Sequence, residues 1–475
     1  MRLKYIALAV LMTGFSQLKA EVVLPSVLGH SMILQREQPV PVWGTAAAGE
    51  MIRIQFAQQV KETQTDGNGK WKVLLDPMEA SAQPQDLTIA GTNTIVLKNI
   101  LIGEVWLCSG QSNMEYAMRK NSKLTKPYSG VNPVDELEYA DNDQIRIFLV
   151  NRKELIKPQA DHGGWNVASG SALRSFSAAG YFFAKELNKR LQVPVGMISS
   201  AIPGSRIEPW MPLAVAPTLD GEPGKFYTPM IEPLLPFAVK GFLWYQGETS
   251  VFLNDSSQYT AKMKLLIDSW RKAWNSPDLP FYYVQLAPFY YSKSGGEIKL
   301  NRESLPKMWE AQEQALSIPH TGMMVSTDLV SDLNGIHPGF KWEIGRRLAL
   351  LALRDTYHVK VVANGPVYQG MKQVANKMQL SFKSVGAGLY SKDGQKLRCF
   401  TIAGADGKFV PADAVIKNNK VLVSASSVKK PVAVRFAWTE DSQSNFFNRD
   451  GLPAAPFRTD RPAFLKSNQD LYTIK

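Results

Sequence analysis

The middle of this 475-residue chain alternates between two hydrophobic patterns, and this alternation limits the folds open to it. Short apolar, β-prone runs occupy residues 103–107, 145–150, 195–201, 241–245, 280–286 and 323–327. Amphipathic helical stretches occupy residues 175–191, 259–274, 305–316 and 340–357. Strands that alternate with helices along a chain typically form a parallel sheet with helices on both faces. The pattern therefore predicts an α/β domain over residues 100–360.

The segments 21–99 and 361–475 lack the helical pattern and consist of short runs between turn residues, a spacing typical of all-β sandwich domains. Pro39 and Pro41 share one of these runs, and because neither can donate a hydrogen bond to a neighbour, the run should form an edge strand. No repeat or low-complexity linker separates the segments. We expect two β-sandwich domains packed against a central α/β domain.

The first twenty residues have the composition of a secretory signal. Arg2 and Lys4 precede an apolar stretch over residues 6–15, and Ala20 offers a small residue before a cleavage point. This stretch is too short to span a bilayer, and no later run is long enough. We expect an exported protein, periplasmic or extracellular, without a membrane span.

The net charge and the two cysteines give little information about binding partners. Removal of Arg2, Lys4 and Lys19 would lower the formal net charge from +12 by three, to +9, and the remaining lysines are scattered rather than clustered, so we expect no nucleic-acid partner. Cys108 and Cys399 could form a disulfide after export, but Cys108 lies in an apolar run, where cysteine is more often a small buried hydrophobe.

Ser112 is the candidate nucleophile. It follows the apolar run at residues 105–107 at once, in a segment, 109–113, that turns the chain. In an α/β sheet, ligands bind at the carboxyl ends of the strands, and a serine that opens a helix has backbone N–H groups nearby to receive an oxyanion. The alternative is that Ser112 serves only as a helix N-cap.

His337 is the candidate base. It lies in the loop between the apolar run at 323–327 and a long helical stretch, which places it at the same sheet edge as Ser112. The other four histidines have settings with less obvious chemistry: His30, His162, His320 and His358. The alternative for His337 is a surface histidine in a turn rich in glycine and proline.

Two further strand ends offer hydrogen-bond donors for an oxyanion hole. Gly204 follows the run at 195–201, and its missing side chain would let a carbonyl oxygen approach the backbone. Gln246 follows the run at 241–245 and can donate from its amide, while the neighbouring Glu248 can accept. Alternatively, Gly204 marks only a tight turn and Glu248 is a structural hydrogen-bond anchor.

These motifs resemble those of the sialate O-acetylesterases, a family of the SGNH (GDSL-like) hydrolase superfamily. The similar segments are GQSNME at 110–115, WYQGE at 244–248 and IHP at 336–338, with flanking segments MILQR at 32–36, PVWG at 41–44 and GLPAAPFRTD at 451–460. The resemblance implies a flavodoxin-like α/β/α catalytic domain without a metal or organic cofactor. It also implies hydrolysis of O-acetyl esters on a sugar, with Ser112 as nucleophile, Gly204 in the oxyanion hole and His337 as base.

The chain departs from the superfamily pattern at two places. Gln246 stands in the third motif, where the superfamily usually has an oxyanion-hole asparagine, and Asn334 stands three residues before His337, where it usually has an aspartate. Asp332, Asn334 or Glu248 could therefore orient the imidazole, with Asp332 the nearest carboxylate in sequence. A Ser–His pair supported only by backbone carbonyls is a fourth possibility.

The sequence gives less information about the substrate than about the reaction. Arg206 could pair with a sialate carboxylate, or it could be a structural partner of Glu208, and Trp210 could lie against a sugar face. The resemblance implies an O-acetylated sialic acid as substrate. The alternatives are another acetylated glycan such as xylan, or a non-catalytic carbohydrate-binding protein. The oligomeric state cannot be inferred from the sequence.

Overall fold

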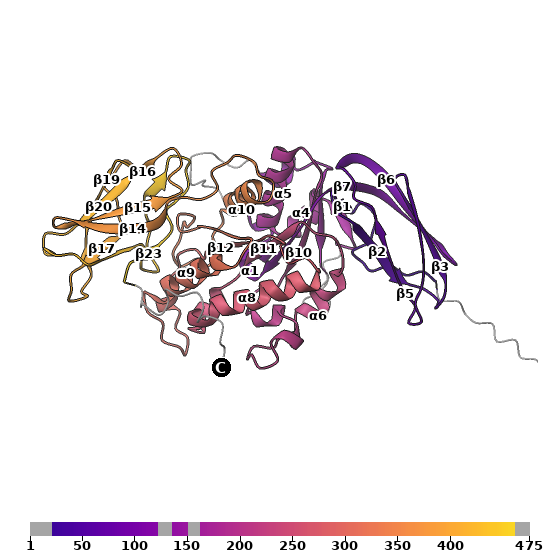
Figure 1. Cartoon of the computed structure of the whole chain (residues 1–475), viewed down its shortest axis with the longest axis horizontal. Helices are drawn as coiled ribbons and strands as arrows, with labels where there is room; N and C mark the ends of the chain where they lie inside the picture. Colours follow the sequence, from indigo (N-terminus) through magenta and orange to yellow (C-terminus); the bar gives the residue numbers. More distant parts are fainter. Residues whose placement is uncertain (1–20, 122–134, 151–161, 461–475) are drawn as a thin grey trace, which may run out of the picture.

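The computed structural model describes residues 21–121, 135–150 and 162–460. The expected signal segment, 1–20, lies outside the described residues. β-sheet regions stand at the two ends of the molecule, and a mixed α/β region lies between them (Figure 1). Within the described ranges, no helix is both long and apolar enough to cross a membrane.

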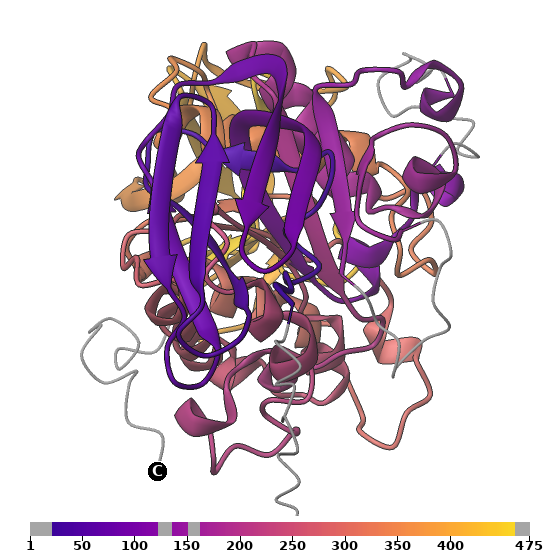
Figure 2. The same cartoon turned by 90° about the vertical axis from the view of Figure 1, so that its right-hand side faces the viewer.

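The N-terminal region is built from strands, as its alternating pattern predicts. They are β1 (Ile33–Gln35), β2 (Val40–Thr45), β3 (Met51–Phe56), β4 (Gln59–Gln64), β5 (Lys70–Leu75), β6 (Ser81–Ala90) and β7 (Thr94–Gly110). β2, the run that contains Pro41, pairs with β5 on one side and, among the described residues, has only a single bridge from Thr45 to Val23 beyond it, so it is an edge strand, as predicted. Figure 2 shows these strands in front of the rest of the molecule.

β7 joins this region to the central one. Its first half pairs antiparallel with β6, and residues Glu104 to Gly110 pair in parallel with β10. The boundary expected at residue 100 therefore falls inside one continuous strand. A single hydrophobic core extends from the N-terminal strands into the central region, which ties the two together.

The central sheet has the strand order β13-β12-β11-β7-β10-β8-β9, and its neighbours are parallel except for β8 and β9. Its further strands are β8 (Ile145–Leu149), β9 (Trp165–Val167), β10 (Val195–Ala201), β11 (Gly241–Tyr245), β12 (Phe281–Val284) and β13 (Thr321–Met324). β10 and β11 are buried along their whole length, which is typical of parallel strands covered on both faces.

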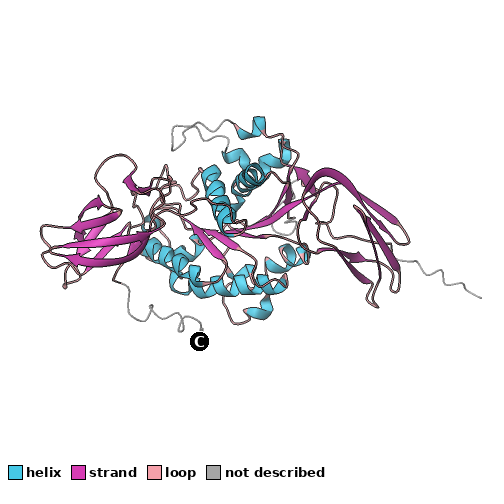
Figure 3. Ribbon diagram, turned by 45° about the horizontal axis from the view of Figure 1, so that its top comes forward, coloured by secondary structure: helices cyan, strands magenta, loops and turns pink. Residues whose placement is uncertain are grey.

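Helices cover both faces of this sheet (Figure 3). They are α1 (Ser112–Glu115), α2 (Met118–Asn121), α3 (Glu136–Tyr139), α4 (Gly170–Ser175), α5 (Ala178–Leu191), α6 (Tyr227–Met230), α7 (Glu248–Phe252), α8 (Ser256–Ala273), α9 (Ser304–Gln314) and α10 (Lys341–Asp355). Short 3-10 turns are η1 (Glu208–Trp210), η2 (Leu213–Val215), η3 (Glu232–Leu234), η4 (Tyr291–Lys293) and η5 (Ala315–Ser317). α5 packs against α10, and α8 packs against α9 on the opposite side (Figure 1).

The C-terminal region is again all β and has a hydrophobic core of its own. Its strands are β14 (Val367–Val374), β15 (Lys377–Lys383), β16 (Leu389–Ser391), β17 (Phe400–Ala403), β18 (Val410–Pro411), β19 (Asp413–Lys417), β20 (Lys420–Ser424), β21 (Ala433–Phe436), β22 (Phe446–Asn448) and β23 (Phe457–Arg458). Cys399, in this region, and the buried Cys108 are free thiols, and burial raises the pKa of Cys108 to about 12.

Candidate active site

Ser112 lies at the carboxyl end of β7, the central strand of the parallel sheet. β7 ends at Gly110, which has φ +138°, and α1 begins at Ser112. A Cβ at Gly110 would lie 2.2 Å from the carbonyl oxygen of Tyr245 at the end of β11, so a side chain cannot be accommodated in this turn. The glycine thus lets β7 and β11 stay in contact while the chain turns sharply to present Ser112.

His337 lies next to Ser112 at the carboxyl edge of the sheet. It lies in the loop between β13 and α10, and its Nε2 is 2.8 Å from Oγ of Ser112, although the two residues are 225 positions apart in the chain. This is hydrogen-bonding distance between a hydroxyl and an imidazole nitrogen, the arrangement that allows a histidine to take a proton from a serine. The structure therefore brings together the two residues on which the sequence interpretation depends.

The surroundings of His337 favour its neutral form. Partial withdrawal of the ring from water lowers the pKa of His337, and the nearby ammonium groups of Lys341 and Lys120 lower that pKa further. Tyr116 packs beside the ring, with centroids 6.5 Å apart. A neutral imidazole is the form that can accept a proton, so these groups favour the form of His337 that a general base would need.

Asn113, next to Ser112, connects the serine segment to the histidine segment. Its Nδ2 donates hydrogen bonds to Oε1 of Glu248 and, at 3.0 Å, to the backbone carbonyl of Ile336, the residue before His337. Its Oδ1 accepts a hydrogen bond from Nζ of Lys341. Because all these contacts act on one amide, Asn113 fixes its own segment relative to the loop that carries His337.

Lys341 and Glu248 form the buried charged part of this network. Lys341, the first residue of α10, is fully buried and lies over the rings of Tyr116 and Tyr245, 4.8 and 4.9 Å from their centroids. Burial lowers the pKa of Lys341 to about 7. Burial also raises the pKa of Glu248, although the hydrogen bond from Asn113 and the charge of Lys341 act in the opposite direction.

The backbone N–H groups of Ser112 and Gly204, which are expected to form an oxyanion hole, have no acceptor among the described residues. Gly204 lies in the turn after β10, with φ +70°, and the adjacent Ser205 donates from its hydroxyl to the carbonyl of Gly110 at 3.3 Å. The Gly204 turn is therefore held against the turn that leads to Ser112.

Gln246 contacts this turn with its side chain. Its Nε2 donates to the carbonyl oxygen of Ser205 at 3.2 Å, its Oε1 accepts from the hydroxyl of Tyr259 at 2.9 Å, and the residue is fully buried. The amide thus braces the segment that carries Gly204. The neighbouring Gly247 donates its N–H to Oε1 of Gln111 at 3.3 Å, which ties the β11 end to the serine turn.

Asp332 and Asn334 contact each other. Oδ1 of Asp332 accepts from the backbone N–H and the Nδ2 of Asn334, at 2.9 and 3.1 Å, and both residues are exposed. Within the described part of the chain, no carboxylate forms a hydrogen bond or an ion pair with His337. Asp332 and Asn334 therefore shape the turn before His337.

The structure corrects one of the two substrate contacts expected from the sequence, that of Trp210, and gives the other, Arg206, a structural partner while its recognition role stays a prediction. Trp210 is fully buried, donates from Nε1 to Ser205 at 3.1 Å and packs against Trp244, so it cannot lie against a sugar. The guanidinium of Arg206 donates two hydrogen bonds to Glu208, at 3.2 and 3.1 Å, and lies 3.7 Å from Asp220. Arg206 thus has the structural role that the sequence left open as an alternative.

Sequence reasoning did not identify Asn113 or Lys341. Asn113 lies within the serine motif, but nothing in the sequence indicates its contacts with residues more than a hundred positions away. For Lys341 a signal exists in hindsight: it opens α10 on the face that Ile344 and Leu348 bury, where a charged residue is unusual. The described residues contain no cluster of three or more His, Cys, Asp or Glu side chains able to hold a metal ion.

Comparison with known proteins identifies the family of this chain. Residues 102–354 match the family model described as "Carbohydrate esterase, sialic acid-specific acetylesterase". The sialate O-acetylesterase of Homo sapiens is 26% identical over 494 aligned positions, covering 91% of each chain, and that of Rattus norvegicus is also 26% identical.

A solved structure is similar over nearly the full length. The carbohydrate acetylesterase XAC1771 from Xanthomonas citri is 35% identical, with a TM-score of 0.83, and the match covers 93% of this chain and 100% of that one. The chain is therefore an esterase and belongs to the family of sialic acid-specific acetylesterases among the carbohydrate esterases.

Proposed function

We propose that the protein hydrolyses O-acetyl esters of sialic acids, with Ser112 as nucleophile and His337 as general base. The observation that carries this proposal is the 2.8 Å contact between Oγ of Ser112 and Nε2 of His337 at the carboxyl edge of the parallel sheet. Family membership supplies the reaction class, and the relatives named sialate O-acetylesterases supply the substrate.

The reaction would proceed in two halves. Nε2 of neutral His337 takes the hydroxyl proton while Oγ of Ser112 attacks the acetyl carbonyl carbon, and the N–H groups of Ser112 and Gly204 receive the oxyanion. The imidazolium then gives its proton to the departing sugar oxygen, which leaves an acetyl-serine. A water molecule, deprotonated by His337, attacks this ester, and acetate is released as Ser112 recovers its proton.

The remaining polar residues would act through these groups. Gln246 holds Ser205, and thereby supports the turn that offers the Gly204 N–H. Asn113 holds the carbonyl of Ile336, and thereby the backbone that leads to His337. In this proposal the imidazole works without an aspartate partner, and the Asn113, Glu248 and Lys341 network performs the positioning that a third catalytic residue often provides.

A second candidate is an acetylesterase for another glycan. Two observations favour it: XAC1771, at 35% identity, is titled a carbohydrate acetylesterase without mention of sialic acid, and Arg206 is already engaged by Glu208. Both candidates share the chemistry at Ser112 and differ only in the alcohol that leaves.

Acetate release from two substrates separates the candidates. The protein is incubated with O-acetylated sialic acid and with acetylated xylan at equal acetyl concentration, and free acetate is measured. Faster release from the sialic acid, expressed as kcat/KM, supports the first proposal, whereas faster release from xylan supports the second. Release from neither substrate would contradict both candidates and indicate a different acetylated glycan.

We also propose that the chain is exported. The proposal depends on the basic and apolar pattern of residues 1–20. Fractionation of cells that express the full chain, followed by mass spectrometry of its N-terminus, would test it. Recovery of uncut chain only in the cytoplasm would overturn it.

A further inference from the structure

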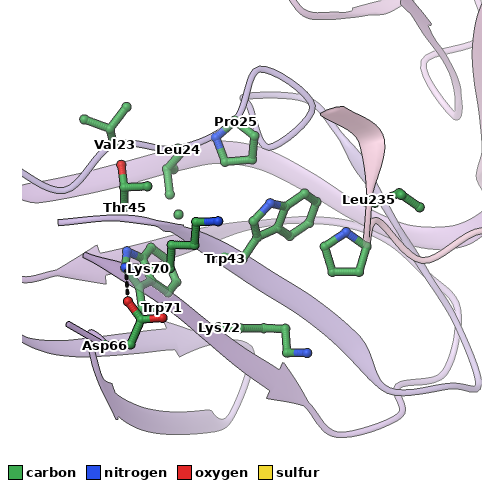
Figure 4. Close-up of a pocket in the computed structure, with 12 residues that line it drawn as sticks. Val23, Leu24, Pro25, Trp43, Thr45, Asp66, Lys70, Trp71, Lys72 and Leu235 are labelled. Atoms are coloured by element: carbon green, nitrogen blue, oxygen red, sulfur yellow. Dashed lines mark hydrogen bonds between the residues drawn. The ribbon is translucent and has the colours of Figure 1, made fainter. Parts of the chain in front are cut away.

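A groove of about 760 Å³ lies between the N-terminal strands and the central region, and none of the site residues described above lines it. Trp43 and Thr45 of β2 and Lys70 and Lys72 of β5 line one side, while Leu235 and Pro236 line the other (Figure 4). This cavity is called the Trp43 groove below. Its volume is in the range that protein sites for small organic ligands occupy.

The pairing of β2 with β5 places these side chains on one face. Trp43 is opposite Lys72 and Thr45 is opposite Lys70, and residues directly opposite in an antiparallel pair project to the same side of a sheet. Val42 and Val73, the alternate pair, are buried on the other side. Trp43 is only partly buried, and contact with Phe237, at a centroid distance of 6.4 Å, holds its ring. In Figure 4, Lys70 lies to the left of Trp43 and Lys72 lies below it.

The two ammonium groups of the groove lack a carboxylate partner. In the described ranges 21–121, 135–150 and 162–460, no Asp or Glu oxygen lies within 4.0 Å of Nζ of Lys70 or Lys72. Asp66, the carboxylate that lines the groove, accepts from the backbone N–H groups of Asn68 and Lys70, both at 2.9 Å, and so stabilises its own turn. The groove therefore combines an aromatic surface with two lysines and one aspartate, an excess of one positive charge.

We propose that the Trp43 groove is a non-catalytic binding site for a carboxylate-bearing glycan. The C–H face of a pyranose ring can pack on the indole of Trp43, and the hydroxyl of Thr45 can hydrogen-bond to a sugar hydroxyl. The ammonium groups of Lys70 and Lys72 can attract a sugar carboxylate, because both lysines lie on the same sheet face as Trp43 and neither forms an ion pair with a described residue. A neutral glycan would use the ring and leave both charges without a partner.

This site would act independently of the esterase reaction. A glycan held in the Trp43 groove stays attached between turnovers, which raises the local concentration of acetylated residues near Ser112 when the chain is long enough to reach both sites. Short substrates such as p-nitrophenyl acetate cannot gain from this effect. The inference therefore does not require the proposed sialate activity.

Isothermal titration calorimetry on the full chain tests the proposal. The probes are oligogalacturonate and an oligomer of sialic acid, both without acetyl groups, and a neutral cello-oligosaccharide of the same length. At least one acidic probe should bind at least about tenfold more tightly than the neutral one, and its affinity should fall as salt is raised. Trp43→Ala, and separately Lys70→Gln with Lys72→Gln, should each weaken that binding about tenfold or more.

The double variant Lys377→Gln with Lys420→Gln is the matched control, because it removes two exposed lysines from the C-terminal strands and should bind like the wild type. All variants should hydrolyse p-nitrophenyl acetate at the wild-type rate, and Trp43→Phe should restore part of the affinity if Trp43→Ala disturbs the fold. Three results would each overturn the proposal: no binding of either acidic probe, equal binding of the neutral probe, or wild-type affinity in the lysine variant. Loss of esterase activity on all substrates with intact binding would overturn only the proposed function.

Discussion

Nζ of Lys341 donates a hydrogen bond to Oδ1 of Asn113, and this contact connects the start of α10 to the residue that follows Ser112. The bond fixes which end of the Asn113 amide faces the lysine, and so directs Nδ2 toward Glu248 and the carbonyl of Ile336. One buried lysine thus sets the orientation of the amide that connects the Ser112 segment to the loop of His337.

Lys341→Met should lower kcat on p-nitrophenyl acetate about 10- to 100-fold, because a small displacement of reacting groups has effects of this size. Methionine keeps the apolar stem of the lysine and removes the donor, which leaves Oδ1 of Asn113 buried without a partner. KM should change much less than kcat. A kcat within twofold of the wild type would show that the network does not position the site.

The pH dependence of kcat/KM should have its acid limb below pH 6.5. His337 must be neutral to act as a base, and partial burial together with Lys341 and Lys120 lowers its pKa from the ordinary value of 6.5. Activity should therefore be retained at pH 6.5 and be lost as pH falls through the lowered pKa. An acid limb above pH 7 would contradict this assignment.

The variant Lys120→Met separates two effects: that of a positive charge on the pKa of His337, and that of the hydrogen bond from Lys341 on the position of Asn113. Removal of a positive neighbour raises the pKa of His337, so the acid limb should move to higher pH in both Lys120→Met and Lys341→Met. Lys120 is exposed and forms no hydrogen bond with Asn113 among the described contacts, so the plateau rate of Lys120→Met should stay near that of the wild type. An equal loss of plateau rate in the two variants would refute a positioning role for Lys341.

Glu248→Gln should retain most of the activity, whereas Glu248→Leu should lose it. The glutamine keeps an acceptor oxygen for Nδ2 of Asn113, and the leucine leaves that donor buried without a partner. We expect kcat for the leucine variant to be about 10- to 100-fold below that of the glutamine variant, for the geometric reason given for Lys341. Equal rates would indicate that the hydrogen bond from Asn113 to residue 248 is not needed.

Arg206→Ala should lower kcat/KM on acetylated sialic acid and on an aryl acetate by similar, small factors. Its guanidinium is paired with the buried Glu208, so its loss should act mainly on the stability of that segment and lower the melting temperature. Parallel assays of the two substrates distinguish a structural role of Arg206 from a role in substrate recognition. A loss on the sialic acid at least tenfold larger than on the aryl acetate would restore a recognition role.

The central elements were predictable because their patterns are strong. The runs at 195–201 and 241–245 coincide with β10 and β11, since continuous apolar residues between turn residues leave little choice of bounds. β4 (Gln59–Gln64) was not predicted, because the sequence QVKETQ has a single apolar residue and the strand is exposed along one side. β19 (Asp413–Lys417) was also not predicted: its sequence DAVIK has three apolar residues in a row without alternation, and only Ala414 is buried.

The proximity of Ser112 and His337 followed from topology, whereas the Asn113–Lys341 contact did not. Both Ser112 and His337 follow strands of one parallel sheet, and the carboxyl ends of such strands lie along a common edge. Lys341 shares the apolar face of α10 with Ile344 and Leu348, which hints at burial, but only the packing of Tyr116 and Tyr245 around it shows where its ammonium group lies. Trp210 was misjudged because an aromatic residue near a site can equally well belong to the core.

Hydrolysis of p-nitrophenyl acetate by Ser112→Ala tests the central claim most directly. The substitution removes only the hydroxyl that lies 2.8 Å from His337, so the fold should be kept and circular dichroism should match the wild type. We predict that kcat falls by a factor of about 1,000 or more, as is common when a serine nucleophile is removed. A folded Ser112→Ala variant that hydrolyses the ester at the wild-type rate would contradict the account.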